Sequence, residues 1–360
     1  MAGDAEGRLR VVLDCYRPAD RRRLASPETV AMGARVASLF SGYEVDEELR
    51  PVARLLDYDL DERLASLVAL EARIPEDAYS AKTLQTERVG NAIVLSPEGL
   101  MLTIGYLVTE AEEVIVTTNS GARIEAHVLG IDQATGFGLL HALEPLGLPP
   151  MPISDSRKVR GQAPVISAGA GGRSHALSGR ILAREPFAGY WEYYLEAALF
   201  VEPAHPHWNG AALLGPSGDL IGVGSLKMEQ MAQGGDVSPL NMFVPAELLA
   251  PILDDLSHGR QARPPRPWLG VLCQEVSSHV VVADVSTGGP ASRAELRRGD
   301  VIHRIAGHRV GDLGDFYKHL WALGPPGVVA PLTIQREHDV FDVAIRTADR
   351  QALQKKRRLN

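Results

Sequence analysis

The chain has 360 residues, of which 45% are hydrophobic and 23% are charged, and its formal net charge is -8. This length indicates two or three folded domains, and the acidic balance argues against a general nucleic-acid-binding protein. The two cysteines, Cys15 and Cys273, lie too far apart in sequence to indicate a disulfide framework or a metal site.

The start of the chain lacks the basic and apolar regions of a signal peptide. No apolar run reaches the roughly 20 residues that a membrane-spanning helix needs. We therefore expect a cytoplasmic protein that does not enter a membrane.

Residues 1–80 are predicted to form a small, mostly helical module. Ser26-Pro27 is typical of a helix start, because a capping side chain precedes a proline that needs no amide partner there. Three stretches then show apolar residues at helical spacing: Met32, Val36, Leu39 and Phe40; Val45, Leu49, Val52 and Leu56; Leu60, Leu64, Leu67 and Val68. No catalytic cluster lies here, so we predict a packing or oligomerisation module, with a partner-docking domain as the alternative.

The pattern changes in residues 81–256 to short apolar runs separated by Gly, Asp, Asn and Pro turns. Such runs indicate an antiparallel barrel or sandwich. They lie at 91–95, 100–103, 113–117, 123–129, 164–167 and 220–223.

Five motifs follow one another in this segment: VGNAIVLSPEGLMLT (89–103), ARIEAHVLGID (122–132), ISDSRKVRG (153–161), ALSGRIL (176–182) and MFVPA (242–246). Their order resembles the HtrA/Deg branch of the trypsin-like serine proteases. The resemblance implies a chymotrypsin-like double β-barrel.

The resemblance also implies where a catalytic triad would lie. Tyr106 stands at the histidine position, Gly136 at the aspartate position and Asn209 at the serine position. Tyrosine is a poor base near neutral pH, glycine offers no side chain, and an amide is no nucleophile of this type. We therefore predict no catalytic residue at these positions and a pseudoprotease that is not an enzyme. The alternative is a serine-type endopeptidase or other hydrolase with a relocated site.

His205 and His207 lie beside Asn209, but two histidines without a third ligand are a weak metal signal. We predict no metal and no cofactor. The same half of the segment is rich in aromatic residues, which form either barrel core or a surface for a partner. These are Phe187, Tyr190, Trp191, Tyr193, Tyr194, Phe200 and Trp208.

A proline-rich, basic linker is predicted at 257–267. The motifs WLGV (268–271), GPAS (289–292), LRRGDVI (296–302) and AGHRV (306–310) follow it. They resemble the PDZ domains attached to HtrA proteases, which implies a PDZ domain over 268–348 and a basic tail over 349–360.

The PDZ resemblance implies that a peptide would pair with an exposed sheet edge. Its terminal carboxylate would be held by the loop of Trp268, Leu269, Gly270 and Val271, where glycine permits a close approach.

The sequence as a whole predicts a mainly β protein with a helical N-terminal module, a double β-barrel and a PDZ domain. The predicted function is an adaptor or scaffold that binds a peptide, a protein C-terminus or an unfolded segment, and an ATP-independent chaperone is a further alternative. The HtrA resemblance also implies a homo-oligomer.

Overall fold

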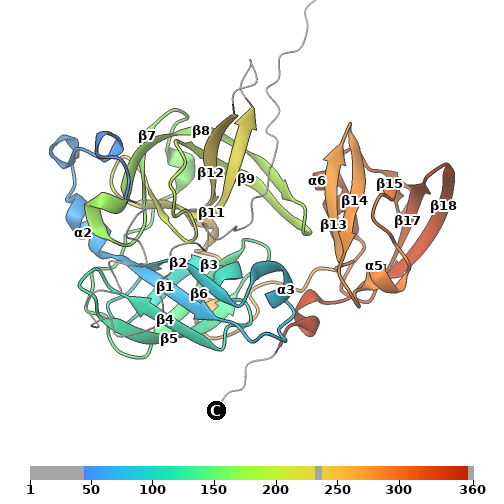
Figure 1. The fold of residues 1–360 in the computed structure, drawn as a ribbon, viewed down its shortest axis with the longest axis horizontal. Helices are drawn as coiled ribbons and strands as arrows, with labels where there is room; N and C mark the ends of the chain where they lie inside the picture. The colour runs from blue at the N-terminus through green and yellow to red at the C-terminus, as the bar shows by residue number, and fades with distance from the viewer. Residues whose placement is uncertain (1–43, 232–236, 356–360) are drawn as a thin grey trace, which may run out of the picture. The chain divides into compact units, whose positions relative to one another are not determined.

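The computed structural model describes residues 44–231 and 237–355, so the helix predicted to start at Ser26 lies outside the described residues. The chain divides into two compact units (Figure 1). One contains the chain up to Glu185 together with Ala198–Gln261, and the other contains Pro186–Ala197 together with the chain from Ala262.

The first unit begins with a closed barrel in the strand order β1-β2-β3-β6-β5-β4. All of its strand pairs are antiparallel, and closure leaves no free sheet edge. The strands are β1 Leu67–Arg73, β2 Glu87–Val94, β3 Leu100–Ile104, β4 Glu113–Thr117, β5 Arg123–Ile131 and β6 Phe137–Ala142. The short helices α2 Leu60–Ala65 and α3 Ala81–Leu84 flank β1 in sequence.

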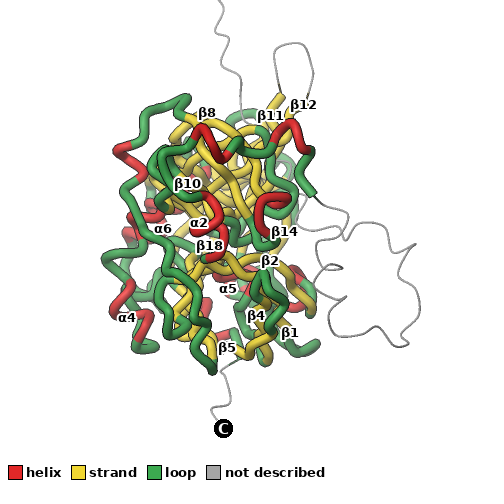
Figure 2. Tube along the Cα trace, turned by 90° about the vertical axis from the view of Figure 1, so that its left-hand side faces the viewer, coloured by secondary structure: helices red, strands yellow, loops and turns green. Residues whose placement is uncertain are grey.

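A second closed barrel has the order β10-β11-β12-β9-β8-β7. Its strands are β7 Pro164–Ala168, β8 Ala176–Gly189, β9 Tyr193–Glu202, β10 Ala212–Leu214, β11 Leu220–Met231 and β12 Val237–Pro245. The helix α4 Leu253–Ser257 follows. The prediction of a mainly β double barrel is confirmed, and strands make up most of the regular structure (Figure 2).

The described part of the predicted helical module differs from the prediction for 1–80. Its last apolar stripe is helical only over α2, and Leu67 and Val68 begin β1, which pairs with both β2 and β4. Leu67 and Val68 are fully buried, as expected for a barrel strand covered on both faces. A short apolar run of this kind fits a buried strand and a helix equally well, which is why the spacing misled. No helix in the described part of the chain is long and apolar enough to span a membrane.

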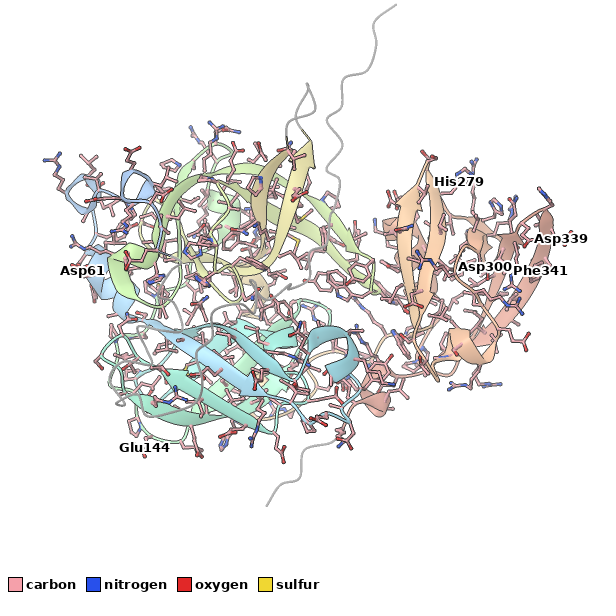
Figure 3. The ribbon with its side chains drawn as sticks, in the orientation of Figure 1. Asp61, Glu144, His279, Asp300, Asp339 and Phe341 are labelled. Carbon is pink, nitrogen blue, oxygen red and sulfur yellow. The ribbon has the colours of Figure 1, made fainter. Side chains whose placement is uncertain are left out.

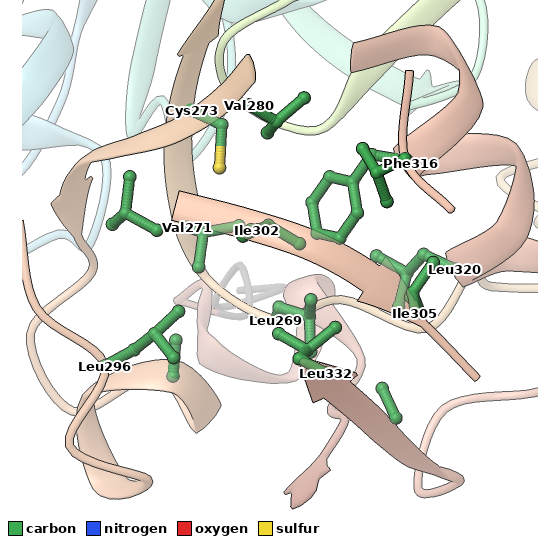
Figure 4. Packing of buried hydrophobic residues seen from close by; sticks show 14 of the residues in the cluster. Leu269, Val271, Cys273, Val280, Leu296, Ile302, Ile305, Phe316, Leu320 and Leu332 are labelled. Carbon is green, nitrogen blue, oxygen red and sulfur yellow. The ribbon is translucent and has the colours of Figure 1, made fainter. Parts of the chain in front are cut away.

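The second unit contains a sheet in the order β13-β14-β15-β17-β18, with β16 paired to β15. The strand β13 therefore lies at an edge. The strands are β13 Val271–Val276, β14 His279–Val285, β15 Val301–Ile305, β16 His308–Arg309, β17 Val329–Arg336 and β18 Asp339–Arg346, and the helices are α5 Pro290–Arg293 and α6 Leu313–Ala322. Figure 4 shows the core between sheet and helices, which includes Leu269, Cys273, Ile302 and Phe316.

A buried ion pair fixes one end of this unit. Asp300, labelled in Figure 3, is 1% exposed and accepts hydrogen bonds from Arg336 Nε at 2.7 Å and from the Arg297 amide at 2.8 Å. Burial raises the pKa of Asp300, but these hydrogen bonds outweigh it and bring the pKa below its usual value. The contribution of the carboxylate to stability is therefore present above its usual pKa and is lost as pH falls through the lowered one.

Replacing Arg336 with methionine is expected to reduce the free energy of unfolding by about 3 kcal/mol at pH 7, because a buried charge would lose its partner. Guanidinium unfolding measures this effect, which should shrink in acid as Asp300 becomes protonated. Arg346→Met is the control, since Arg346 makes an exposed hydrogen bond to the Gly327 carbonyl. Equal losses for both variants would contradict the prediction.

Candidate functional site

The position predicted for the catalytic histidine lies in a 3-10 turn, Gly105–Leu107, directly after β3. The Tyr106 hydroxyl is 2.7 Å from Asn209 Oδ1 and 2.9 Å from the Ser225 carbonyl oxygen. A hydroxyl has one proton and donates to one of these acceptors at a time. The structure thus brings Tyr106 and Asn209 into contact.

Gly136 lies in the turn before β6, where Asp132 Oδ2 accepts from both the amide and the hydroxyl of Thr135. The φ of Gly136, 81°, is a left-handed conformation that glycine adopts without strain. The Gly136 carbonyl accepts a hydrogen bond from the Gly105 amide at 2.6 Å. Gly136 therefore supports the backbone of the Tyr106 turn but has no carboxylate with which to orient a base.

The loop carrying Asn209 is held by the first barrel. The Asn209 carbonyl accepts from the Asn91 amide at 2.8 Å and from Asn91 Nδ2 at 3.0 Å. Gly210 follows with a φ of 70°, and a Cβ there would overlap the Asn91 carbonyl oxygen. Asn91 is fully buried. The three positions at which the resemblance implies a triad thus hold a phenol, an amide and no side chain, on a backbone held by hydrogen bonds from both barrels.

His205 uses both ring nitrogens in backbone contacts. Its Nδ1 accepts from the His207 amide at 3.0 Å, so its Nε2 carries the proton that it donates to the His175 carbonyl, also at 3.0 Å. Burial lowers the pKa of His205 to about 4, which keeps the ring neutral at pH 7. This arrangement leaves His205 no lone pair for a metal, and the described residues contain no group of three metal-ligating side chains.

The second candidate site is the loop that precedes β13. The amides of Leu269, Gly270 and Val271, which we call the carboxylate cradle, all donate to Oε1 of Glu192, at 3.2, 2.7 and 3.1 Å. Trp268, predicted to belong to this loop, instead exchanges two backbone hydrogen bonds with Ala348. A loop of consecutive amides aimed at one oxygen is a site for an anion.

Glu192 belongs to the turn between β8 and β9. We call residues 189–192, which are the last residue of β8 and this turn, the hairpin tip. Glu192 is 9% exposed. Burial raises the pKa of Glu192 to about 7, against the opposing effect of the three cradle amides. The only sign of this contact in the sequence is that the tip lies within the aromatic stretch, which was predicted to form either barrel core or a surface for a partner.

The rest of the tip contacts both β13 and α6. The Cys273 amide of β13 donates to the Tyr190 carbonyl at 2.9 Å. The buried Tyr317 hydroxyl of α6 donates to the Gly189 carbonyl at 2.7 Å and accepts from the Glu192 amide at 3.2 Å. Tyr317 is buried on α6 together with Leu313, Phe316 and Leu320.

Comparison with known families matches residues 90–223 to the trypsin-like peptidase domain and residues 267–347 to the PDZ domain. Two curated relatives are named probable periplasmic serine endoprotease DegP-like. The protein from Halomonas elongata is 24% identical over 72% of this chain, and that from Pseudomonas fulva is 26% identical over 70%. The chain is an HtrA-like protein.

The HtrA-like chain spans about half the length of these relatives, 56% and 54%. Among solved structures, a variant of the HtrA-type protease AlgW with tripeptide is similar with a TM-score of 0.50 and 22% identity, over 80% of this chain and 94% of the other. At this identity the likeness concerns the fold.

These relatives correct two predictions made from the sequence. The prediction that the HtrA-like protein is not an enzyme is contradicted, because the relatives are named serine endoproteases. That prediction used only the residues at three positions, which do not exclude hydrolysis by other groups. The predicted cytoplasmic location is also contradicted, because the relatives are named periplasmic.

Proposed function

We propose that this HtrA-like protein recognises peptides or unfolded protein segments through its PDZ domain, by binding their terminal carboxylates in the cradle of Leu269, Gly270 and Val271. The observation that carries the proposal is the convergence of these three amides on one carboxylate oxygen. Charge-assisted hydrogen bonds of this kind contribute about 1.5–3 kcal/mol each. The adjacent edge of β13 offers the backbone groups with which an extended peptide would pair.

The test is binding of fluorescein-labelled decapeptides with randomised last four positions to the full chain. Replacing the terminal carboxylate by a carboxamide is expected to weaken binding at least tenfold, since the cradle offers only donors. Fluorescence anisotropy measures the dissociation constants. Equal affinity for acid and amide forms would contradict recognition of a terminal carboxylate.

The names of the relatives favour a second function, peptide-bond hydrolysis outside the cytoplasm. Because Tyr106, Gly136 and Asn209 stand at the triad positions, hydrolysis by this chain would use a nucleophile elsewhere. A fluorophosphonate probe and a casein assay test this function. Labelling that one serine substitution abolishes would support it, whereas neither labelling nor casein cleavage would contradict it. Chaperone activity and oligomerisation remain predictions, to be tested by light scattering of a denatured client and by sedimentation.

A further inference from the structure

The hairpin tip makes the contacts that an incoming peptide would need. The Glu192 carboxylate fills the cradle, and the Tyr190 carbonyl accepts a hydrogen bond from the Cys273 amide at the outer edge of β13. From α6, the Tyr317 hydroxyl bonds to both ends of the tip, at Gly189 and Glu192. A peptide and the hairpin tip therefore cannot occupy the site together.

The fit of the tip comes at a conformational cost. Glu192 has a φ of 59°, a left-handed conformation that costs a residue with a side chain about 1 kcal/mol. Its carboxylate is also removed from water. Both costs are offset by the cradle amides, and a residue persists in such a conformation only where its surroundings over-determine it. The contact is therefore a built one rather than a chance approach of two loops.

Residues beside the tip anchor it further to the PDZ domain. Tyr194 contacts α6, where Lys318 Nζ lies 4.7 Å from the centre of its ring. A Cβ at Gly314 would lie 3.0 Å from the Tyr194 ring, which would have to move by a few tenths of an ångström to admit it. These contacts explain why Pro186–Ala197 forms one compact unit with the PDZ domain.

We infer that the hairpin tip is an internal ligand that occludes the PDZ groove, with Glu192 standing in for a terminal carboxylate. The tip is covalently tethered, and a short tether gives an effective concentration on the order of millimolar. An external peptide binds only the fraction of molecules in which the tip has left, so its apparent dissociation constant is raised by the inverse of that fraction. Weak ligands are thereby excluded, and ligands that are strong or locally concentrated displace the tip.

The inference rests on the proposed function for the identity of the external ligand, so its test has two arms. The variant Glu192→Ala in the full chain removes the carboxylate, and Glu196→Ala is the matched control, because Glu196 is an exposed carboxylate on the same hairpin. In the first arm, the decapeptides with free carboxylates are expected to bind Glu192→Ala at least tenfold more tightly than wild type, with no change for Glu196→Ala.

The second arm needs no ligand. Hydrogen exchange of the Leu269, Gly270 and Val271 amides is expected to be at least tenfold faster in Glu192→Ala than in wild type and unchanged in Glu196→Ala. Unchanged exchange in Glu192→Ala would overturn occlusion. Faster exchange without binding of any decapeptide would support occlusion and contradict the proposed ligand. Equal peptide affinity in all three proteins, dependent on the terminal carboxylate, would support the proposed function and overturn occlusion. If Glu192→Ala does not fold, Glu192→Gln removes the charge and keeps the shape, and the same outcomes are expected in smaller degree.

Discussion

Replacing Gly270 with alanine is expected to weaken peptide binding about thirtyfold, equivalent to about 2 kcal/mol. Gly270 has a φ of 78°, and its amide makes the shortest of the three cradle hydrogen bonds, at 2.7 Å. A Cβ at this position would lie 2.8 Å from the Trp268 ring and 3.3 Å from Ser286 Cβ. The loop must shift to relieve this contact, and a shift moves all three amides out of convergence.

The measurement is best made in the Glu192→Ala background. In wild type the substitution weakens the binding of the internal Glu192 carboxylate and of the peptide carboxylate alike. Their competition for the cradle would therefore hide the effect. Gly307→Ala is the matched control, because Gly307 also has a left-handed φ, of 80°, but nothing lies within 4 Å of a Cβ there. Both variants carry a similar backbone strain of about 1 kcal/mol. Affinity that falls equally in both would show that the cradle is not the binding site.

The barrels and the PDZ domain could be predicted because their signals are local. Apolar runs between Gly, Asp and Pro turns mark strands, and the order of the motifs marks the family. By contrast, Leu67 and Val68 were misassigned, because burial on both faces of a strand removes the period-2 pattern that identifies strands.

The occupied groove could not be predicted, because it depends on pairs far apart in sequence. Glu192 and the cradle are separated by 77 to 79 positions, and Glu192 differs from its neighbour Glu196 only in what surrounds it. The aromatic residues of the tip were predicted to form either barrel core or a surface for a partner, and neither alternative named the PDZ domain of the same chain. The role of Tyr317 could not be predicted for the same reason, since its hydroxyl bonds to a turn more than 100 positions away.

Replacing Asn91 with alanine is expected to destabilise the barrel unit by about 3 kcal/mol, a large effect for a polar side chain. Asn91 Nδ2 donates to the His207 and Asn209 carbonyls at 3.1 and 3.0 Å, and its Oδ1 accepts from the Ala170 amide at 2.9 Å. These groups lie on the second barrel, and Asn91 itself is fully buried. The Asn209 carbonyl keeps its hydrogen bond from the Asn91 backbone amide in the alanine variant, but the His207 carbonyl and the Ala170 amide lose their bonds to the side chain. Leaving these two buried groups without a partner is the main cost.

The control for this variant is Asn119→Ala, which removes the same chemical group from a similar position. Asn119 also bridges the barrels, since its Nδ2 donates to the Leu64 carbonyl at 3.0 Å and its Oδ1 accepts from the Gly171 amide at 2.8 Å. Asn119 is exposed, so water replaces its amide and the expected loss is below about 1 kcal/mol. Guanidinium unfolding of both variants gives the comparison. A loss for Asn91→Ala no larger than that for Asn119→Ala would mean that the Asn209 loop is held by its own backbone hydrogen bonds, such as that between the Gly210 amide and the Gly224 carbonyl. A larger loss for Asn91→Ala would instead show that the first barrel determines the shape of this loop, through a side chain that the sequence marks only as part of a strand.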